Sequence, residues 1–217
     1  QWGMWHEIGH TYQMERMDWH DMVEVTVNIY SLRAQKAFGQ RSRLEEGNTY
    51  REMFNYLNQT KKEFDQQDVW MRLGMFWQLE LAFGEDFYPS LHKRYREEQK
   101  SLSSEQAKRQ YFVVSASKIS GKNLTPFFEQ WGIEVTNESK KELAALPKLT
   151  KKIWEYRDEM TGEIGNIEED TQAPTIPTNI VATVTSDSVQ LRWNPASDNV
   201  GVIGYNIYRN GQWIAKT

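Results

Sequence analysis

A pair of histidines suited to binding a metal ion lies near the start of the sequence, in His6-Glu7-Ile8-Gly9-His10. This is the H-E-x-x-H pattern of zinc peptidases, in which histidines at i and i+4 share one face of a helix. Two imidazoles at that spacing can reach one zinc ion, which in catalytic sites takes about three protein ligands and a water. Glu7 points beside the ion rather than at it, and would accept a proton from the attacking water as a general base.

The five-residue pattern also occurs in helices where it is simply a polar face, so a third ligand is needed. Glu24, in the next helical segment, is the candidate. Asn28 lies one turn later on the same face, and it either holds the second ring nitrogen of a ligating histidine or is a buried asparagine with backbone partners. His20 lies between the two segments, where it contacts metal or substrate or is an exposed loop histidine.

The motif and its flanks resemble a known family. Gln1–Gln13 followed by Glu24–Leu32 is similar to the enhancin-like, mucin-targeting zinc metallopeptidases, a gluzincin family defined by H-E-x-x-H and a downstream glutamate. A later stretch, Asn123–Ile133, resembles the C-terminal helical part of that family, so the resemblance extends to residue 155. It implies that His6, His10 and Glu24 bind zinc and that Glu7 is the catalytic residue.

The resemblance also implies a biological role. We expect a secreted or cell-surface bacterial endopeptidase that cuts glycoproteins, with mucin-type O-glycosylated proteins as substrates. A non-catalytic glycan-binding or adhesin protein that keeps the peptidase fold is the alternative, although such a relative is expected to lose one of the four motif residues. A purely structural zinc is less consistent with this donor set, because closed structural sites generally use four ligands and include cysteine. Trp2 and Trp5 either shape the substrate cleft or pack the motif helix against a neighbouring sheet.

Composition excludes several other classes. The 217 residues carry a net charge of −4 and 26% charged residues, which argues against a nucleic-acid binder. The absence of cysteine excludes a disulfide scaffold, and no apolar run is long enough to span a membrane. The chain has no initiator methionine or signal peptide, and we expect it to be a fragment cut at both ends. Without a preceding β-sheet, Met4, Trp5 and Ile8 would be partly exposed, and the fragment alone would be inactive.

Apolar periodicity predicts a mainly α-helical N-terminal part. The motif helix is expected over residues 3–16 and the Glu24 helix over 22–38, with a polar loop at 39–48. A helical subdomain follows to residue 155, and its most apolar helix, 68–83, should end at Gly84. The aromatic residues of that helix either belong to the core or line a sugar-binding cleft, and the core is the more common place for aromatic residues at helical spacing.

The pattern changes to a period of two near the C-terminus. Residues 179–185, 188–193 and 204–209 alternate as half-buried strands, and residues from Pro174 onward resemble the start of a fibronectin type III domain. Such a sandwich needs about seven strands, so this one is incomplete. We therefore predict a metallopeptidase portion at 1–156, a linker at 157–173 and an incomplete fibronectin-like module at 174–217, which would contact glycans or the cell surface.

Overall fold

The computed structural model describes residues 1–158, 173–197, 202 and 205–216. Most of the predicted linker, 157–173, therefore lies outside the described residues. Contacts along the chain separate two compact units, Gln1–Glu163 and Ile164–Thr217. We call their described parts the helical unit and the strand unit. In the described residues, no helix is long and apolar enough to cross a membrane.

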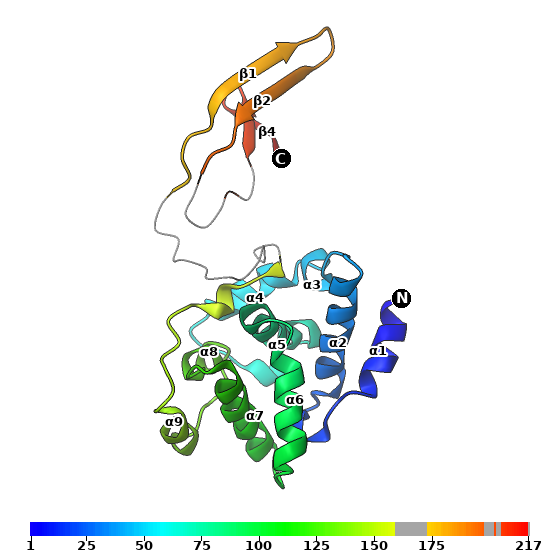
Figure 1. The fold of residues 1–217 in the computed structure, drawn as a ribbon, viewed down its shortest axis with the longest axis vertical. Coiled ribbons are helices and arrows are strands. Elements are labelled where there is room, and N and C mark those ends of the chain that lie inside the picture. The colour runs from blue at the N-terminus through cyan, green and yellow to red at the C-terminus, as the bar shows by residue number, and fades with distance from the viewer. Residues whose placement is uncertain (159–172, 198–201, 203–204, 217) are drawn as a thin grey trace. The chain divides into compact units, whose positions relative to one another are not determined.

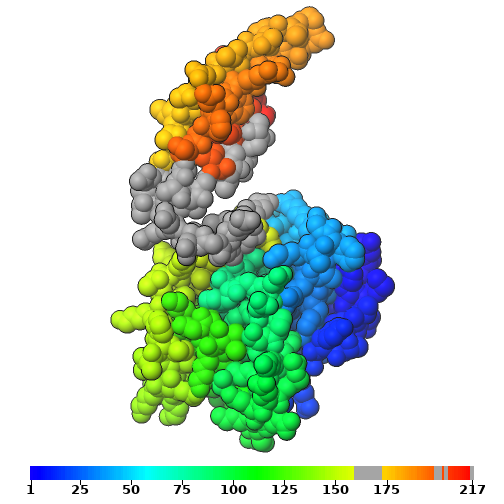
Figure 2. Space-filling view, viewed as in Figure 1, coloured from blue at the N-terminus to red at the C-terminus, as the bar shows by residue number. Residues whose placement is uncertain are grey.

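The helical unit winds around one buried helix, α5, with α1 at its edge beside α2 (Figure 1). The space-filling view shows the N-terminal residues along that edge (Figure 2). The α-helices are α1 (Trp2–His10), α2 (Val23–Ala37), α3 (Arg43–Glu46), α4 (Thr49–Leu57), α5 (Val69–Phe83), α6 (Phe87–Glu98), α7 (Glu105–Ser120), α8 (Thr125–Gln130) and α9 (Asn137–Leu143). Short 3-10 helices occupy Glu15–Met17, Phe64–Gln66 and Ile153–Glu155.

Helix α5 is largely apolar and mostly buried, which is typical of a helix surrounded by protein. The Asp68 carboxylate accepts hydrogen bonds from the backbone N–H groups of Trp70 and Met71, and Gly84 ends the helix with a φ of 83°. The bounds agree with the predicted helix. Phe76 and Trp77 are 0% and 1% exposed, so these aromatic side chains form core rather than a sugar-binding surface.

Helix α1 is shorter than predicted, because it ends at His10 and not near residue 16. A tertiary contact follows the early end. The Tyr12 carbonyl oxygen accepts a hydrogen bond from the Tyr30 hydroxyl at 3.0 Å, instead of serving as a helical acceptor. Met14 is then extended, and a 3-10 turn leads towards α2. The helix α3, capped by Ser42, likewise lies inside the predicted loop 39–48.

The outer face of α1 carries apolar side chains. Met4 is 60% exposed and Ile8 is 49% exposed, as expected from the sequence. Trp5 is half-buried, since its ring stacks on Phe38 with centroids 5.6 Å apart.

The helical unit includes the last residues before the undescribed segment. Asp158 accepts hydrogen bonds from the Tyr50 hydroxyl and from the indole N–H of Trp77. Arg157 donates to the buried carboxylate of Glu45. Both residues were placed in the linker by the sequence pattern, and both contact the α3–α5 region in the structure.

The strand unit contains two antiparallel pairs. Strand β1 (Thr178–Val184) pairs with β2 (Val189–Asn194), and β3 (Asn206–Arg209) pairs with β4 (Gln212–Lys216). Asn210 and Gly211 join β3 to β4 with φ values of 53° and 78°, the positive values that tight two-residue hairpins require. Most side chains of β1 and β2 are exposed, including Val184 and Val189.

His92 on α6 makes the stability of the helical unit dependent on pH. Its Nε2 atom lies 3.4 Å from the Tyr30 hydroxyl. Burial, together with smaller contributions from the positive charges of Arg96 and Arg33, lowers the pKa of His92 from 6.5 to about 4. Because the pKa is lower in the folded chain than in the unfolded chain, the stabilisation is complete above pH ~6.5 and is lost as the pH falls towards 4.

Between pH 7.5 and pH 5, the free energy of unfolding of the wild type should fall by up to about 2 kcal/mol more than that of a His92→Gln variant. Glutamine keeps a polar group beside Tyr30 but does not titrate. Denaturant titrations of both proteins at the two pH values measure the difference. Equal pH dependence of the two proteins would show that His92 is not buried in its neutral form.

Candidate metal centre

The contact between α1 and α2 positions the motif residues. Gly9 is buried against α2, and a Cβ atom built there would lie 2.9 Å from both the Cγ2 atom and the carbonyl oxygen of Val27. Glycine therefore allows the two backbones to approach more closely than any other residue would. The close approach brings the histidines of α1 over Glu24, in the first turn of α2.

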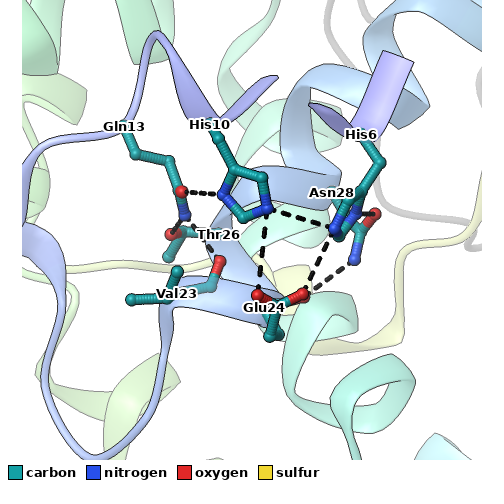
Figure 3. A network of polar contacts seen from close by, with 7 residues as sticks. All are labelled: His6, His10, Gln13, Val23, Glu24, Thr26 and Asn28. Atoms are coloured by element: carbon teal, nitrogen blue, oxygen red, sulfur yellow. Dashed lines mark hydrogen bonds and ion pairs between the residues drawn. The ribbon is translucent and has the colours of Figure 1, made fainter. Parts of the chain in front are cut away.

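Three donor groups converge at this crossing (Figure 3). The Nε2 atoms of His6 and His10 are 3.2 Å apart. Glu24 places Oε2 3.2 Å from His6 Nε2, and Oε1 3.8 Å from His10 Nε2. One ligand atom from each residue lies within 4.8 Å of the others, and within the described parts of the chain these residues form the one such group. The His6 and His10 side chains are 20% and 30% exposed and that of Glu24 is 61% exposed, so the site is open to solvent on one side.

Two side-chain amides contact the other ring nitrogens. Asn28, considered above for such a contact, has its Oδ1 3.0 Å from His6 Nδ1, and its Nδ2 donates to the Glu24 carbonyl oxygen. Gln13 has its Oε1 2.7 Å from His10 Nδ1, and its Nε2 donates to the Val23 carbonyl oxygen. Since a carbonyl oxygen can only accept, both amide orientations are fixed, and both Nδ1 atoms must carry the hydrogen.

This tautomer leaves a lone pair on each Nε2 atom. The two lone pairs and the Glu24 carboxylate then face one another at 3.2–3.8 Å with no hydrogen of their own between them. Two nitrogen lone pairs and a carboxylate this close to one another favour a cation among them. Two imidazole nitrogens and one carboxylate also form a donor set known for metals that catalyse hydrolysis. The residues therefore fit a metal ion.

Glu7 lies outside this donor group. It is exposed on α1, and within the described residues no hydrogen bond or ion pair holds its carboxylate. On a helix it is turned by about 100° from His6, next to it in the chain. The exposed carboxylate is open to solvent.

The remaining sequence candidates lie in different places. His20 is exposed, has a φ of 46°, and lines a pocket with Asp18 and Glu105 rather than joining the donor group. Trp2 contacts Trp70, and both rings lie against the Arg43 guanidinium, at 4.9 and 4.6 Å. With Trp5, Trp2 lines a pocket of about 450 Å³ at the N-terminal end of α1.

Gln13 was not identified from the sequence as a site residue. It lies three residues after His10, and in the helix predicted over 3–16 that spacing would have put it on the same face as His10. In the structure α1 ends at His10, and Gln13 makes the contact from the turn that follows. Its contact depends on the turn after His10, which only the tertiary structure defines.

The sequence model of Peptidase M60, enhancin and enhancin-like, matches residues 1–132. The chain belongs to this peptidase family. The M60 chain is 41% identical to a functionally unknown conserved protein from Bacillus anthracis str. Ames, over 72% of this chain and 33% of that one, with a TM-score of 0.69. It shares the fold of the M60 catalytic domain from Clostridium perfringens ZmpC in complex with the sialyl T antigen, with a TM-score of 0.64. That match has 24% identity and covers 100% of this chain and 43% of the ZmpC chain.

A curated relative matches a short part of the M60 chain. Chitinase A1 of Niallia circulans is 53% identical over 49 residues, which are 22% of this chain and 7% of the chitinase. The M60 chain thus covers less than half of each of these three proteins.

A Gly9→Ala substitution tests the helix crossing. The methyl group would meet the Val27 carbonyl, which cannot move without the helix, and α1 would shift away from Glu24. We expect metal affinity to fall at least about tenfold, and the free energy of unfolding to fall by about 1–3 kcal/mol, as for other overpacked sites. Isothermal titration and denaturant unfolding measure the two effects.

Gly3→Ala is the matched control on the same helix. Nothing lies within 4 Å of a Cβ atom at Gly3, so alanine should leave metal affinity unchanged and add about 0.5–1 kcal/mol of stability. Wild-type metal affinity in Gly9→Ala would show that the close approach does not position the ligands.

Proposed function

We propose that this chain is part of a secreted zinc-dependent endopeptidase that hydrolyses glycoproteins, with mucin-type O-glycosylated proteins as substrates. The observation that carries the proposal is the convergence of His6, His10 and Glu24 within 4.8 Å, with Glu7 exposed on the helix that bears the two histidines. Membership of the M60 peptidase family supports peptide hydrolysis. The ZmpC relative, solved in complex with the sialyl T antigen, supports a glycosylated substrate.

The proposed mechanism assigns a task to each residue. Bound by His6, His10 and Glu24, zinc would supply a Lewis acid that activates water and polarises a peptide carbonyl. Glu7 accepts the proton of the attacking water and passes it to the leaving amine. Asn28 and Gln13 hold the two imidazoles with their Nε2 lone pairs facing the ion.

The strand unit has a separate proposed role. Its hairpins are consistent with the first strands of a fibronectin type III domain, and the 49-residue match to chitinase A1 supports a module that other enzymes also carry. We assign it as a spacer or as an arm that contacts glycans or the cell surface. Such modules suit an extracellular enzyme.

The proposed function should be tested with the intact protein, because this chain covers less than half of each solved relative described above. Zinc-loaded protein should cut a glycosylated mucin and leave the enzymatically deglycosylated mucin largely uncut, with cleavage followed by mass spectrometry. Equal rates on both substrates would contradict glycan-directed specificity. Bound zinc without cleavage of either substrate would favour the non-catalytic adhesin.

A further inference from the structure

We infer that Gln13 is a positioning residue of the metal site, which ties His10 to the helix that carries Glu24 and so sets the affinity for zinc. The inference rests on the proposed metal site and adds a residue that lies outside the H-E-x-x-H pattern. Figure 3 shows the Gln13 amide between His10 on one side and Val23 and Thr26 on the other.

All polar atoms of the Gln13 amide have partners. Oε1 accepts from His10 Nδ1 at 2.7 Å. Nε2 donates to the Val23 carbonyl oxygen at 2.6 Å and to the Thr26 hydroxyl at 2.7 Å. An amide with two donations and one acceptance has little rotational freedom, and it therefore fixes both the tautomer and the ring plane of His10.

The two imidazoles are held in parallel ways. Asn28 joins His6 Nδ1 to the Glu24 carbonyl, and Gln13 joins His10 Nδ1 to the Val23 carbonyl. Each histidine of α1 is thus anchored to one of two consecutive carbonyl groups in the first turn of α2. Glu24 belongs to the same turn, so all three donor groups are held relative to the first turn of α2.

The Asn28 contact is made from within α2, where Asn28 is 3% exposed. Gln13 instead lies in the turn after α1, with no helix of its own to hold it. The Gln13 side chain therefore adds, to the backbone contact at Gly9, a second link between His10 and the first turn of α2.

The test uses Gln13→Ala and Gln13→Glu, with Gln130→Ala as the matched control. Gln130 is similarly half-buried and donates to the Leu57 carbonyl at 2.8 Å, with no histidine nearby. Zinc affinity is measured by competition with a chromogenic chelator. The tautomer of His10 in the metal-free chain is read from imidazole ¹⁵N chemical shifts.

For Gln13→Ala we expect a loss of zinc affinity of about 10–100-fold, the range for lost outer-shell partners of ligands, and a mixture of His10 tautomers. Gln13→Glu keeps an acceptor for Nδ1–H, and it should retain the fixed tautomer and bind zinc more tightly than Gln13→Ala. Gln130→Ala should bind zinc as the wild type does.

Three results would overturn the inference: wild-type zinc affinity in Gln13→Ala, an unchanged His10 tautomer in that variant, or an equal loss of affinity in Gln130→Ala. A wild-type chain that binds no zinc would instead refute the proposed metal site. The two failures are therefore distinguishable.

Discussion

A Glu7→Gln variant of the intact protein should retain its metal and lose turnover by about 10²–10⁴-fold, the usual contribution of a general acid–base group. Glutamine has nearly the same size as glutamate but cannot accept a proton. Glu7 is exposed and is not part of the donor group, so the substitution leaves the three ligand side chains in place.

Turnover on a glycosylated mucin and metal content by elemental analysis should be measured on the same preparation. Glu15→Gln is a suitable control, because Glu15 is also exposed and lies in the 3-10 turn after α1. It should keep wild-type turnover. Activity of Glu7→Gln within threefold of the wild type would exclude Glu7 as the base.

A His10→Ala variant should lose zinc affinity by more than about 100-fold, which exceeds the usual effect of losing an outer-shell partner. The substitution removes one of three ligand groups and also leaves the Gln13 amide oxygen without its donor. Ligands that bind only the folded state raise its stability, so zinc should raise the melting temperature of the wild type but not of the variant.

His20→Ala is the matched control for this experiment. His20 is exposed and lies outside the donor group, so its removal should leave zinc content and the zinc-induced rise in melting temperature unchanged. Zinc retained at wild-type affinity by His10→Ala would contradict the ligand assignment. Loss of zinc in His20→Ala would add a ligand that the described geometry does not include.

Local sequence patterns predicted much of the architecture. Helix α5 runs between an N-cap aspartate and a glycine that readily takes positive φ, so local chemistry defines both ends. The strands β1 to β3 lie where the period-two alternation predicted strands, but the expected half-burial is absent from β1, whose side chains are all exposed. The candidate ligands were also named from the sequence, because the i, i+4 spacing of His6 and His10 is a property of one helix.

Contacts distant along the chain account for what the sequence did not predict. The Tyr12 carbonyl oxygen, just beyond α1, accepts a hydrogen bond from the Tyr30 hydroxyl 18 residues away, and such a bond leaves no periodic pattern. Arg157 joins the helical unit through Glu45, 112 residues earlier in the chain. Long-range side-chain bonds of this kind are invisible to local propensity.

The sequence by itself determined the donor types of the candidate site, a histidine pair on one helix face with a glutamate in the next helix. Only the tertiary structure decided their arrangement. The approach of α1 to α2 at Gly9 brings Glu24 within 3.2 Å of His6, and the Asn28 and Gln13 amides direct both Nε2 lone pairs inward. Spacing along one helix follows from backbone geometry, whereas the meeting of two helices depends on which side chains allow their backbones to touch.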